Sequence, residues 1–320
     1  MKISVLGCGR WGSFIAWYCN HIGHDVTLWG RKGSSHLTEL EKTRGNTYVT
    51  LDEKIVLTDA LQKAVDAPFL IISVSSQSLR SFCTQLDAYD LSGKTLLLCM
   101  KGLEEESGKR LTQIVEEIIR SPLQLAVWVG PGHVQELIVG IPNCMVIDSH
   151  YEDTKHTLIN ALSSNLIRFY FGEDLIGTEI GAAAKNVIGI AAGMLDGLHL
   201  TSLKGALMSR GTREISRLIA KMGGDELTAY GLCHLGDYEA TLFSAHSHNR
   251  QYGEAFVQGL PFDSLAEGVS TTKALCLLGK QYDVDMPICR TVYSILFKGE
   301  RPEDALNALF NRDLKSEFYR

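Results

Sequence analysis

The sequence predicts an α/β protein in which a doubly wound parallel sheet is followed by a helical domain. Three observations support this: short β-like runs alternate with helical patterns up to about residue 174, the runs are almost continuously apolar, and long helical periodicities replace them afterwards. We therefore assign residues 1–174 to the sheet domain and residues 175–320 to an all-helical domain.

The predicted strands give the first domain its order. They cover residues 2–6, 24–29, 55–57, 68–74, 95–99, 125–129, 143–147 and 167–171. Nearly continuous apolar strands are typical of a parallel sheet with helices on both faces. Ligands bind such sheets beyond the carboxyl ends of the strands.

A glycine-rich turn links the first strand to an amphipathic helix. Gly7 permits a tight turn, Gly9 lets the backbone approach a pyrophosphate, and Gly12 lets the helix pack closely. The N-terminus of the helix adds amide donors and the positive end of its dipole. Directly after an N-terminal strand, this pattern predicts a Rossmann domain that binds a dinucleotide.

The second predicted strand is followed by Gly30, Arg31 and Lys32, without a carboxylate. A site selective for NAD normally places a carboxylate there for the ribose hydroxyls, whereas an arginine can face a 2′-phosphate or stack on adenine. We therefore expect Arg31 to serve NADP or both cofactors, with NADP slightly favoured. A solvated basic loop is the alternative interpretation.

The stretch from Glu179 to Gly193 predicts a tightly packed helix with Lys185 in its apolar middle. Desolvation disfavours the charged form of a lysine, lowers its pKa and makes it a candidate proton donor near neutral pH. The alternative is that Lys185 reaches the surface or pairs with Glu179.

Three loops after predicted strands carry polar or charged residues, at positions 73–77, 100–104 and 130–136. A lysine directly before a glycine, as at Lys101, can reach a bound anion or a carbonyl oxygen. One such loop is commonly a surface turn, but three in a sheet with a dinucleotide fingerprint favour a catalytic site.

Composition narrows the function classes. The chain of 320 residues has a formal net charge of -6, which argues against a nucleic-acid surface. Its eight cysteines form no C-x-x-C pair and no zinc-like cluster, so we expect reduced thiols, a cytoplasmic location and no metal. We see no targeting segment, and the glycines and two charges of the Lys185 helix argue against membrane insertion.

Several further motifs occur in a fixed order along the chain. They are Gly7 to Gly12, the stretch Arg44-Gly-Asn-Thr-Tyr48, Lys101 to Glu104, Glu179 to Gly193, Leu235 to Asp237, Glu267-Gly268 and Met286 to Ile288. Together they resemble the bacterial NAD(P)-dependent glycerol-3-phosphate dehydrogenases, nearly from end to end. The resemblance implies interconversion of glycerol 3-phosphate and dihydroxyacetone phosphate, a role in phospholipid synthesis, and a helical domain similar to that of 6-phosphogluconate dehydrogenase.

The resemblance also implies roles for individual residues. Lys185 becomes the acid/base catalyst, Lys101 stabilises developing charge or holds the phosphate, and Asp237 holds Lys185 or accepts a substrate hydroxyl. The implied substrate residues are Lys101, Gly130, Gly132, Lys185, Asp237, Ser247, His248 and Asn249. Besides the three fingerprint glycines, the implied cofactor residues are Arg10, Trp11, Arg31, Lys101, Val134, His248, Leu265 and Glu267.

Some of these residues have a plain structural alternative. Asp237 is also typical of a turn, Ser247 to Asn249 of a helix N-cap, and Glu267 of a solvated first helical turn.

The chain departs from the family pattern at three places. His248 replaces an arginine, so phosphate affinity is expected to fall or to depend on pH, with His246 and Arg250 as candidates to compensate. Gly132-His133 replaces a small hydroxyl residue followed by an apolar one, and Ser75 replaces a proline.

Two other functions remain open at this point. A ketopantoate reductase-like enzyme also joins a Rossmann domain to a helical domain with a catalytic lysine, and a cofactor-binding redox sensor without turnover would keep the same fold. Helical domains of this kind commonly bury an apolar face in a dimer, which leaves a homodimer open.

Overall fold

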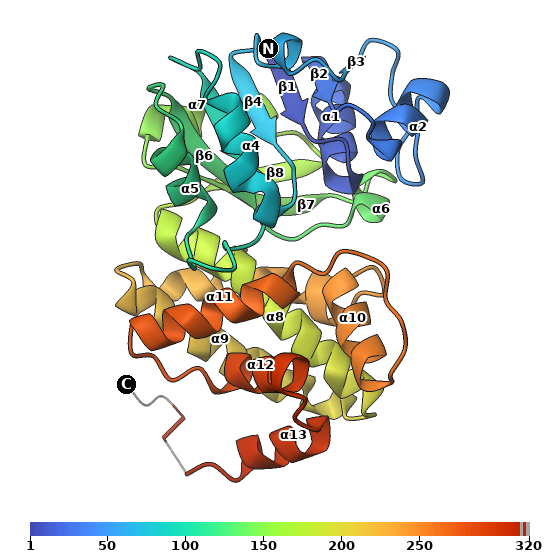
Figure 1. Ribbon diagram of the computed structural model, residues 1–320. Coiled ribbons are helices and arrows are strands. Elements are labelled where there is room, and N and C mark those ends of the chain that lie inside the picture. Colours follow the sequence, from blue (N-terminus) through green and yellow to red (C-terminus); the bar gives the residue numbers. More distant parts are fainter. Residues whose placement is uncertain (314–315, 318–320) are drawn as a thin grey trace.

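An eight-stranded sheet organises the N-terminal half of the computed structural model, which describes residues 1–313 and 316–317 (Figure 1). The last residues of the predicted helical domain, 314–315 and 318–320, lie outside this description. The strands are β1 (Lys2–Leu6), β2 (Asp25–Trp29), β3 (Val56–Thr58), β4 (Phe69–Ile72), β5 (Thr95–Leu98), β6 (Gln124–Val129), β7 (Asn143–Asp148) and β8 (Ile167–Phe171). All eight predicted strands are present. Two, β1 and β8, have the predicted bounds, and the ends of the other six shift by one or two residues.

The strand order is β3-β2-β1-β4-β5-β6-β7-β8, and β1 to β6 run parallel. The chain winds outward from β1 in both directions, which makes the sheet doubly wound. The predicted doubly wound parallel sheet is confirmed for β1 to β6. The last two strands depart from it, because β7 runs antiparallel to β6 and β8 follows the direction of β7. The connection from β6 to β7 contains only α6 (Val134–Leu137), which is too short to return the chain to the far end of the sheet.

Helices cover both faces of this sheet, as alternation along the strands requires. Val5 of β1 belongs to one apolar core, shared with α1 (Arg10–His21), α2 (Ser35–Thr43) and α7 (Glu152–Leu162). Leu6, the next residue, belongs to the opposite core. That core is shared with α3 (Leu61–Ala64), α4 (Leu79–Leu86) and α5 (Leu111–Ile118).

The helical half is built around α8 (Leu175–Gly197), a largely buried helix. Around it pack α9 (Lys204–Lys221), α10 (His248–Val257), α11 (Gly268–Gln281) and α12 (Pro287–Lys298), and α13 (Pro302–Phe310) packs on α12 (Figure 1). Small residues permit this packing: a Cβ atom at Gly193 of α8 would collide with the backbone oxygen of Arg250 on α10. The stretch of small residues in the sequence is therefore a helix-crossing surface.

Helix α8 is also the one helix among the described residues that is long and apolar enough to cross a membrane. Length and composition therefore do not exclude a span, although the glycines and charges of the sequence had argued against one. In the structure most of this helix is enclosed by protein, which explains its apolar composition without a bilayer.

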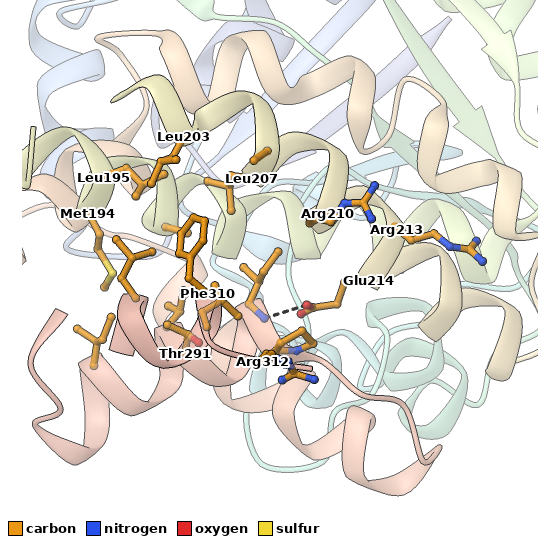
Figure 2. Close-up of a pocket in the computed structure, with 18 of the residues that line it drawn as sticks. Met194, Leu195, Leu203, Leu207, Arg210, Arg213, Glu214, Thr291, Phe310 and Arg312 are labelled. Atoms are coloured by element: carbon orange, nitrogen blue, oxygen red, sulfur yellow. Dashed lines mark hydrogen bonds between the residues drawn. The ribbon is translucent and has the colours of Figure 1, made fainter. Parts of the chain in front are cut away.

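A hollow of about 390 Å³ lies among α8, α9, α12 and α13 (Figure 2). Its wall is mainly apolar and includes Met194, Leu207 and Phe310. The buried carboxylate of Glu214 accepts hydrogen bonds from the backbone N–H groups of Ile288 and Cys289, at 2.8 and 2.9 Å. This contact supplies partners for the free amides at the start of α12 and fixes α12 against α9.

Candidate active site

A cleft of about 740 Å³ opens between the two halves of the molecule, at the carboxyl ends of β1, β4, β5 and β6. Most of the residues predicted for the site line it. They are Gly9, Arg10, Trp11, Lys101, Gly132, Val134, Lys185, Asp237, Ser247, His248, Asn249, Leu265 and Glu267. The structure thus brings together residues from across most of the chain.

Four of the predicted site residues lie outside this lining. Gly7 and Gly12 shape the turn instead: Gly7 has a φ of +119°, and a Cβ at Gly12 would strike the backbone of Gly7. Gly130, with a φ of +126°, offers its carbonyl oxygen to Lys101. Arg31 is exposed just beyond β2.

The turn at Gly9 fits a dinucleotide pyrophosphate. A Cβ atom added at Gly9 would meet no other atom within 4 Å, so open space lies beside its backbone. Gly9 is the N-cap of α1 and has no side chain to satisfy the free amides of that helix. These amides and the helix dipole suit an anion.

Lys185, Asp237 and Lys101 form the charged centre of the cleft. The Nζ atom of Lys185 lies 2.5 Å from Oδ2 of Asp237, and the Nζ atom of Lys101 lies 2.8 Å from the same oxygen. Lys185 is 7% exposed and Asp237 is 1% exposed. One carboxylate oxygen thus holds two ammonium groups within reach of the cleft.

Burial lowers the pKa of Lys185 to about 7. The attraction of Asp237 opposes this shift, and the nearby charge of Lys101 adds to it. At neutral pH the amine therefore exists in both protonation states, as an acid/base group must. The sequence-based expectation of a lowered pKa for Lys185 agrees with this direction.

The alternative partner considered for Lys185 is occupied elsewhere. Glu179 accepts hydrogen bonds from Arg110 at 2.5 Å and from the hydroxyl of Thr112 at 2.6 Å. Lys185 instead donates to the hydroxyl of Thr241 at 3.0 Å. Thr241 in turn donates to the backbone oxygen of Asp237, which ties the lysine to the segment that carries its carboxylate.

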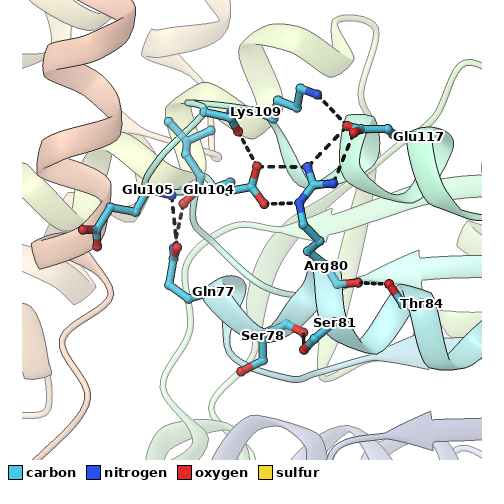
Figure 3. Close-up of polar contacts among 11 residues, drawn as sticks. Gln77, Ser78, Arg80, Ser81, Thr84, Glu104, Glu105, Lys109 and Glu117 are labelled. Carbon is cyan, nitrogen blue, oxygen red and sulfur yellow. Dashed lines mark hydrogen bonds and ion pairs between the residues drawn. The ribbon is translucent and has the colours of Figure 1, made fainter.

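A polar network fixes the loop that carries Lys101 (Figure 3). Arg80 of α4 donates to Glu104 at 2.6 Å, and Gln77 donates to the backbone oxygen of Leu103 at 2.8 Å. From the helical half, Asn186 donates to the backbone oxygen of Lys101 at 2.8 Å. The loop is therefore held from both domains, which limits where the Lys101 ammonium can lie.

The start of α10 forms another wall of the cleft. Ser247 is its N-cap, with its hydroxyl accepting from the backbone N–H of Arg250 at 3.3 Å. Oδ1 of Asn249 accepts from the backbone N–H of Gly268 at 2.9 Å. Ser247 thus has the N-cap role offered as the alternative, whereas Asn249 ties the start of α11 to α10. The positive end of the α10 dipole lies at the cleft.

His248 sits beside a permanent cation. Its Nε2 atom lies 3.3 Å from Arg10, which must donate, so the other ring nitrogen, 3.3 Å from the backbone oxygen of Leu265, carries the proton. Burial lowers the pKa of His248, and the charge of Arg10 lowers it further. Arg250 is paired with Asp196 at 2.8 Å, so Arg10 is the cation next to the substituted position.

Glu267 joins the two halves of the molecule. Its carboxylate accepts from the backbone N–H of Ser76 at 3.2 Å and from the Ser76 hydroxyl. Burial raises the pKa of Glu267, and the bonds from Ser76 oppose that shift. The sequence alternative of a solvated first-turn residue is therefore wrong.

Several cleft residues were missed from the sequence. Tyr48 and Asn46 reach the cleft from the loop after α2, and Asn186 follows Lys185 on α8. Their only signal was membership of the quoted motifs. Thr241 carried no motif, because only the folded chain places the segment from 237 to 246 against α8. His246, named from the sequence as a neighbour of His248, also lines the cleft.

Comparison with known proteins identifies the family. The family model described as NAD-dependent glycerol-3-phosphate dehydrogenase N-terminus matches residues 2–155, and the corresponding C-terminus model matches residues 174–307. The chain belongs to the NAD-dependent glycerol-3-phosphate dehydrogenase family. The resemblance inferred from the sequence motifs is thus confirmed, and the NAD-binding domain agrees with the Rossmann prediction.

Individual relatives cover the full length. Enzymes named glycerol-3-phosphate dehydrogenase [NAD(P)+] from Pelodictyon phaeoclathratiforme and Prosthecochloris aestuarii are 36% and 37% identical, with 99% of this chain and 99% and 100% of theirs aligned. The crystal structure of glycerol-3-phosphate dehydrogenase from Coxiella burnetii superposes with a TM-score of 0.90 at 27% identity, covering 97% of this chain and 99% of that one. The two-part architecture is therefore the architecture of this family.

Proposed function

We propose that the protein catalyses the NAD(P)-dependent interconversion of dihydroxyacetone phosphate and sn-glycerol 3-phosphate. The observation that carries this proposal is the buried Lys185–Asp237–Lys101 centre at the junction of a dinucleotide-binding turn and an apolar helical domain. Relatives named glycerol-3-phosphate dehydrogenase align with this chain over nearly its whole length.

In this mechanism Lys185 is the proton donor for ketone reduction. A nicotinamide cofactor held at the turn around Gly9 would supply the hydride for the ketone carbon, and negative charge would then develop on the ketone oxygen. Lys185 protonates that oxygen, because its lowered pKa makes transfer near neutral pH favourable. Asp237 positions the amine of Lys185, and its charge partly offsets the lowering of the Lys185 pKa by burial. Lys101 stabilises the negative charge that develops on the ketone oxygen.

The phosphate would lie at the start of α10. The free amides and dipole of that helix favour an anion, and Arg10 supplies a permanent charge beside His248. Ser247 and Asn249 shape this end through their backbone contacts, and Gly130 and Gly132 shape the opposite wall. Arg10 thereby takes over the charge that a histidine at position 248 lacks.

The cofactor would lie against the sheet domain, on the side of the cleft that faces the helical domain. Trp11 and Val134 line the cleft beside Gly9, and Leu265 and Glu267 approach from the helical domain. We propose NADP as the slightly favoured cofactor because Arg31 follows β2 where a carboxylate would select NAD.

Free thiols at all eight cysteines support a cytoplasmic location, and a homodimer remains a prediction.

No cluster able to hold a metal occurs among the described residues. The substrate is a small triose phosphate, and its product, glycerol 3-phosphate, would serve phospholipid synthesis.

The test compares substrates. Purified protein should oxidise NADPH and NADH with dihydroxyacetone phosphate and leave ketopantoate essentially untouched. Turnover of ketopantoate alone would establish the ketopantoate reductase alternative. Tight NADPH binding without oxidation by either substrate would establish the sensor.

Replacing Lys185 tests the assigned proton donor. Lys185→Ala should lower kcat for dihydroxyacetone phosphate by about 10²-fold or more, the range of general acid catalysis, while NADPH binding persists. Lys221→Ala, at the exposed end of α9, is the matched control and should keep normal turnover. Undiminished turnover of the Lys185 variant would refute the mechanism.

A further inference from the structure

His133 lies in the cleft without a role in the mechanism above. It follows Gly132, with its φ of +148°, at the carboxyl end of β6 and immediately precedes α6. Its side chain is 8% exposed and forms part of the cleft lining. The family pattern has an apolar residue at this position. The imidazole is therefore a feature of this chain and not of the family pattern.

The ring nitrogen Nε2 of His133 is buried and has no hydrogen-bond partner among the described residues. Buried side-chain polar atoms in native proteins nearly always have a partner, and the exceptions need an explanation. An apolar ring would fill the same space without this cost. Because His133 lines the binding cleft, its unpartnered ring nitrogen points to a partner that arrives with the ligand, once the ring turns that nitrogen into the cleft.

The groups around His133 determine what that partner is. Lys185, Asp237, Glu136 and His246 are the charged or titratable groups that act on it, and the ring of His246 packs edge-on with centroids 5.6 Å apart. Burial lowers the pKa of His133, Lys185 and His246 lower it further, and Glu136 and Asp237 oppose them. The imidazole is therefore neutral at neutral pH and suits an uncharged hydroxyl better than a phosphate dianion.

The substrate offers one such group. In the proposed arrangement Lys185 meets the ketone oxygen and the start of α10 with Arg10 meets the phosphate. Two buried polar atoms of described cleft residues then remain for the free hydroxyl of the triose: Nε2 of His133 and Oδ1 of Asp237, whose carboxylate Lys185 and Lys101 already hold. We propose that Nε2 of His133 hydrogen-bonds this hydroxyl and makes the enzyme specific for ketones that carry it. This inference rests on the proposed function and names a contact within the same site.

The test measures discrimination between two ketones. Dihydroxyacetone phosphate is compared with hydroxyacetone phosphate, which lacks only the free hydroxyl, and the ratio of their kcat/KM values is determined. A site that hydrogen-bonds a substrate hydroxyl rejects the analogue without it strongly, because a buried polar group is left unpaired. His133→Phe should lower the ratio by about tenfold or more.

Two further variants make the result specific. His133→Gln, which can present an amide near the Nε2 position, should restore most of the discrimination. His156→Phe, an exposed histidine of α7 outside the cleft, should leave the ratio unchanged. A merely structural role for His133 would lower both kcat/KM values together, and an unchanged ratio in His133→Phe overturns the inference.

The controls separate this inference from the proposed function. If the unaltered protein reduces neither ketone, the proposed function fails. If it reduces dihydroxyacetone phosphate and its preference survives in the His133 variants, only the inference fails. Binding of NADPH, followed by its fluorescence, verifies folding, and should His133→Phe not bind NADPH, the ratio in His133→Leu decides.

Discussion

Asp237 is the residue that sets how far the pKa of Lys185 falls. Its charge raises that pKa against the effect of burial. Asp237→Asn removes the charge, so the pKa of Lys185 should move below about 7, by about one unit or more, since opposite charges within a few ångströms shift pKa values by 1–3 units. The descending limb of kcat/KM for ketone reduction should then move to lower pH. If the limb lies at the same pH in both proteins, the charge of Asp237 does not set the pKa of Lys185.

Arg31 tests the cofactor preference. Arg31→Glu places a carboxylate where an NAD-selective site has one, and it repels a 2′-phosphate. The ratio of kcat/KM for NADH to that for NADPH should therefore rise by about tenfold. This is the change expected if one repulsive charge contact with the 2′-phosphate costs about 1.4 kcal/mol. Lys32→Glu, the exposed neighbour, is the matched control and should change the ratio much less. Equal changes in both variants would contradict a specific contact.

At the scale of elements, the crossing of α8 and α10 depends on glycines. A Cβ atom at Gly193 would meet the backbone of Arg250, which cannot move without shifting α10. Gly193→Ala should therefore destabilise the protein by about 1–3 kcal/mol, as overpacking does. The midpoint of urea unfolding measures this change, which should be a decrease.

Gly205→Ala in α9 provides the contrast. Nothing lies within 4 Å of a Cβ at this exposed position, so alanine should stabilise the helix by up to about 1 kcal/mol. Equal midpoints for the two variants would show that α8 and α10 do not cross as closely as the structure describes.

The sequence predicted the elements better than their connections. The strands and the Lys185 helix were visible because periodicity and glycine spacing are local signals. The reversal at β7 was missed because an apolar strand has the same pattern in either direction, and only the short α6 shows that the chain cannot return. The partner of Lys185 lies far along the chain, so periodicity could not find Asp237, and only the family resemblance indicated it.

The departures from the family pattern show the same limit. The sequence identified His248 as a substitution, but Arg10, at the other end of the chain, is its neighbour only in the folded protein. Similarly, His133 was visible as an unusual residue, whereas the absence of a partner for its Nε2 atom could come only from the structure.

For the whole molecule, the cleft exists only where both halves meet. Glu267 binds Ser76, Asn186 binds the backbone of Lys101, and Lys273 of α11 pairs with Glu105 at 2.6 Å. The turn at Gly9 comes from the sheet domain, while Lys185 and the start of α10 come from the helical domain. In the proposed mechanism, one domain therefore holds the cofactor and the other carries the proton donor, so this mechanism has to be tested on the complete enzyme.

The most direct test is the pH dependence of kcat/KM in both directions, from about pH 6.5, above the second pKa of the phosphate, which is about 6, to pH 10. Ketone reduction needs protonated Lys185, so its kcat/KM should decline as pH rises above about 7. Oxidation of glycerol 3-phosphate needs the neutral amine, so its kcat/KM should rise through the same pH. Opposite limbs near pH 7 are the predicted result, and profiles that are flat or that run in the same direction would contradict Lys185 as the proton donor.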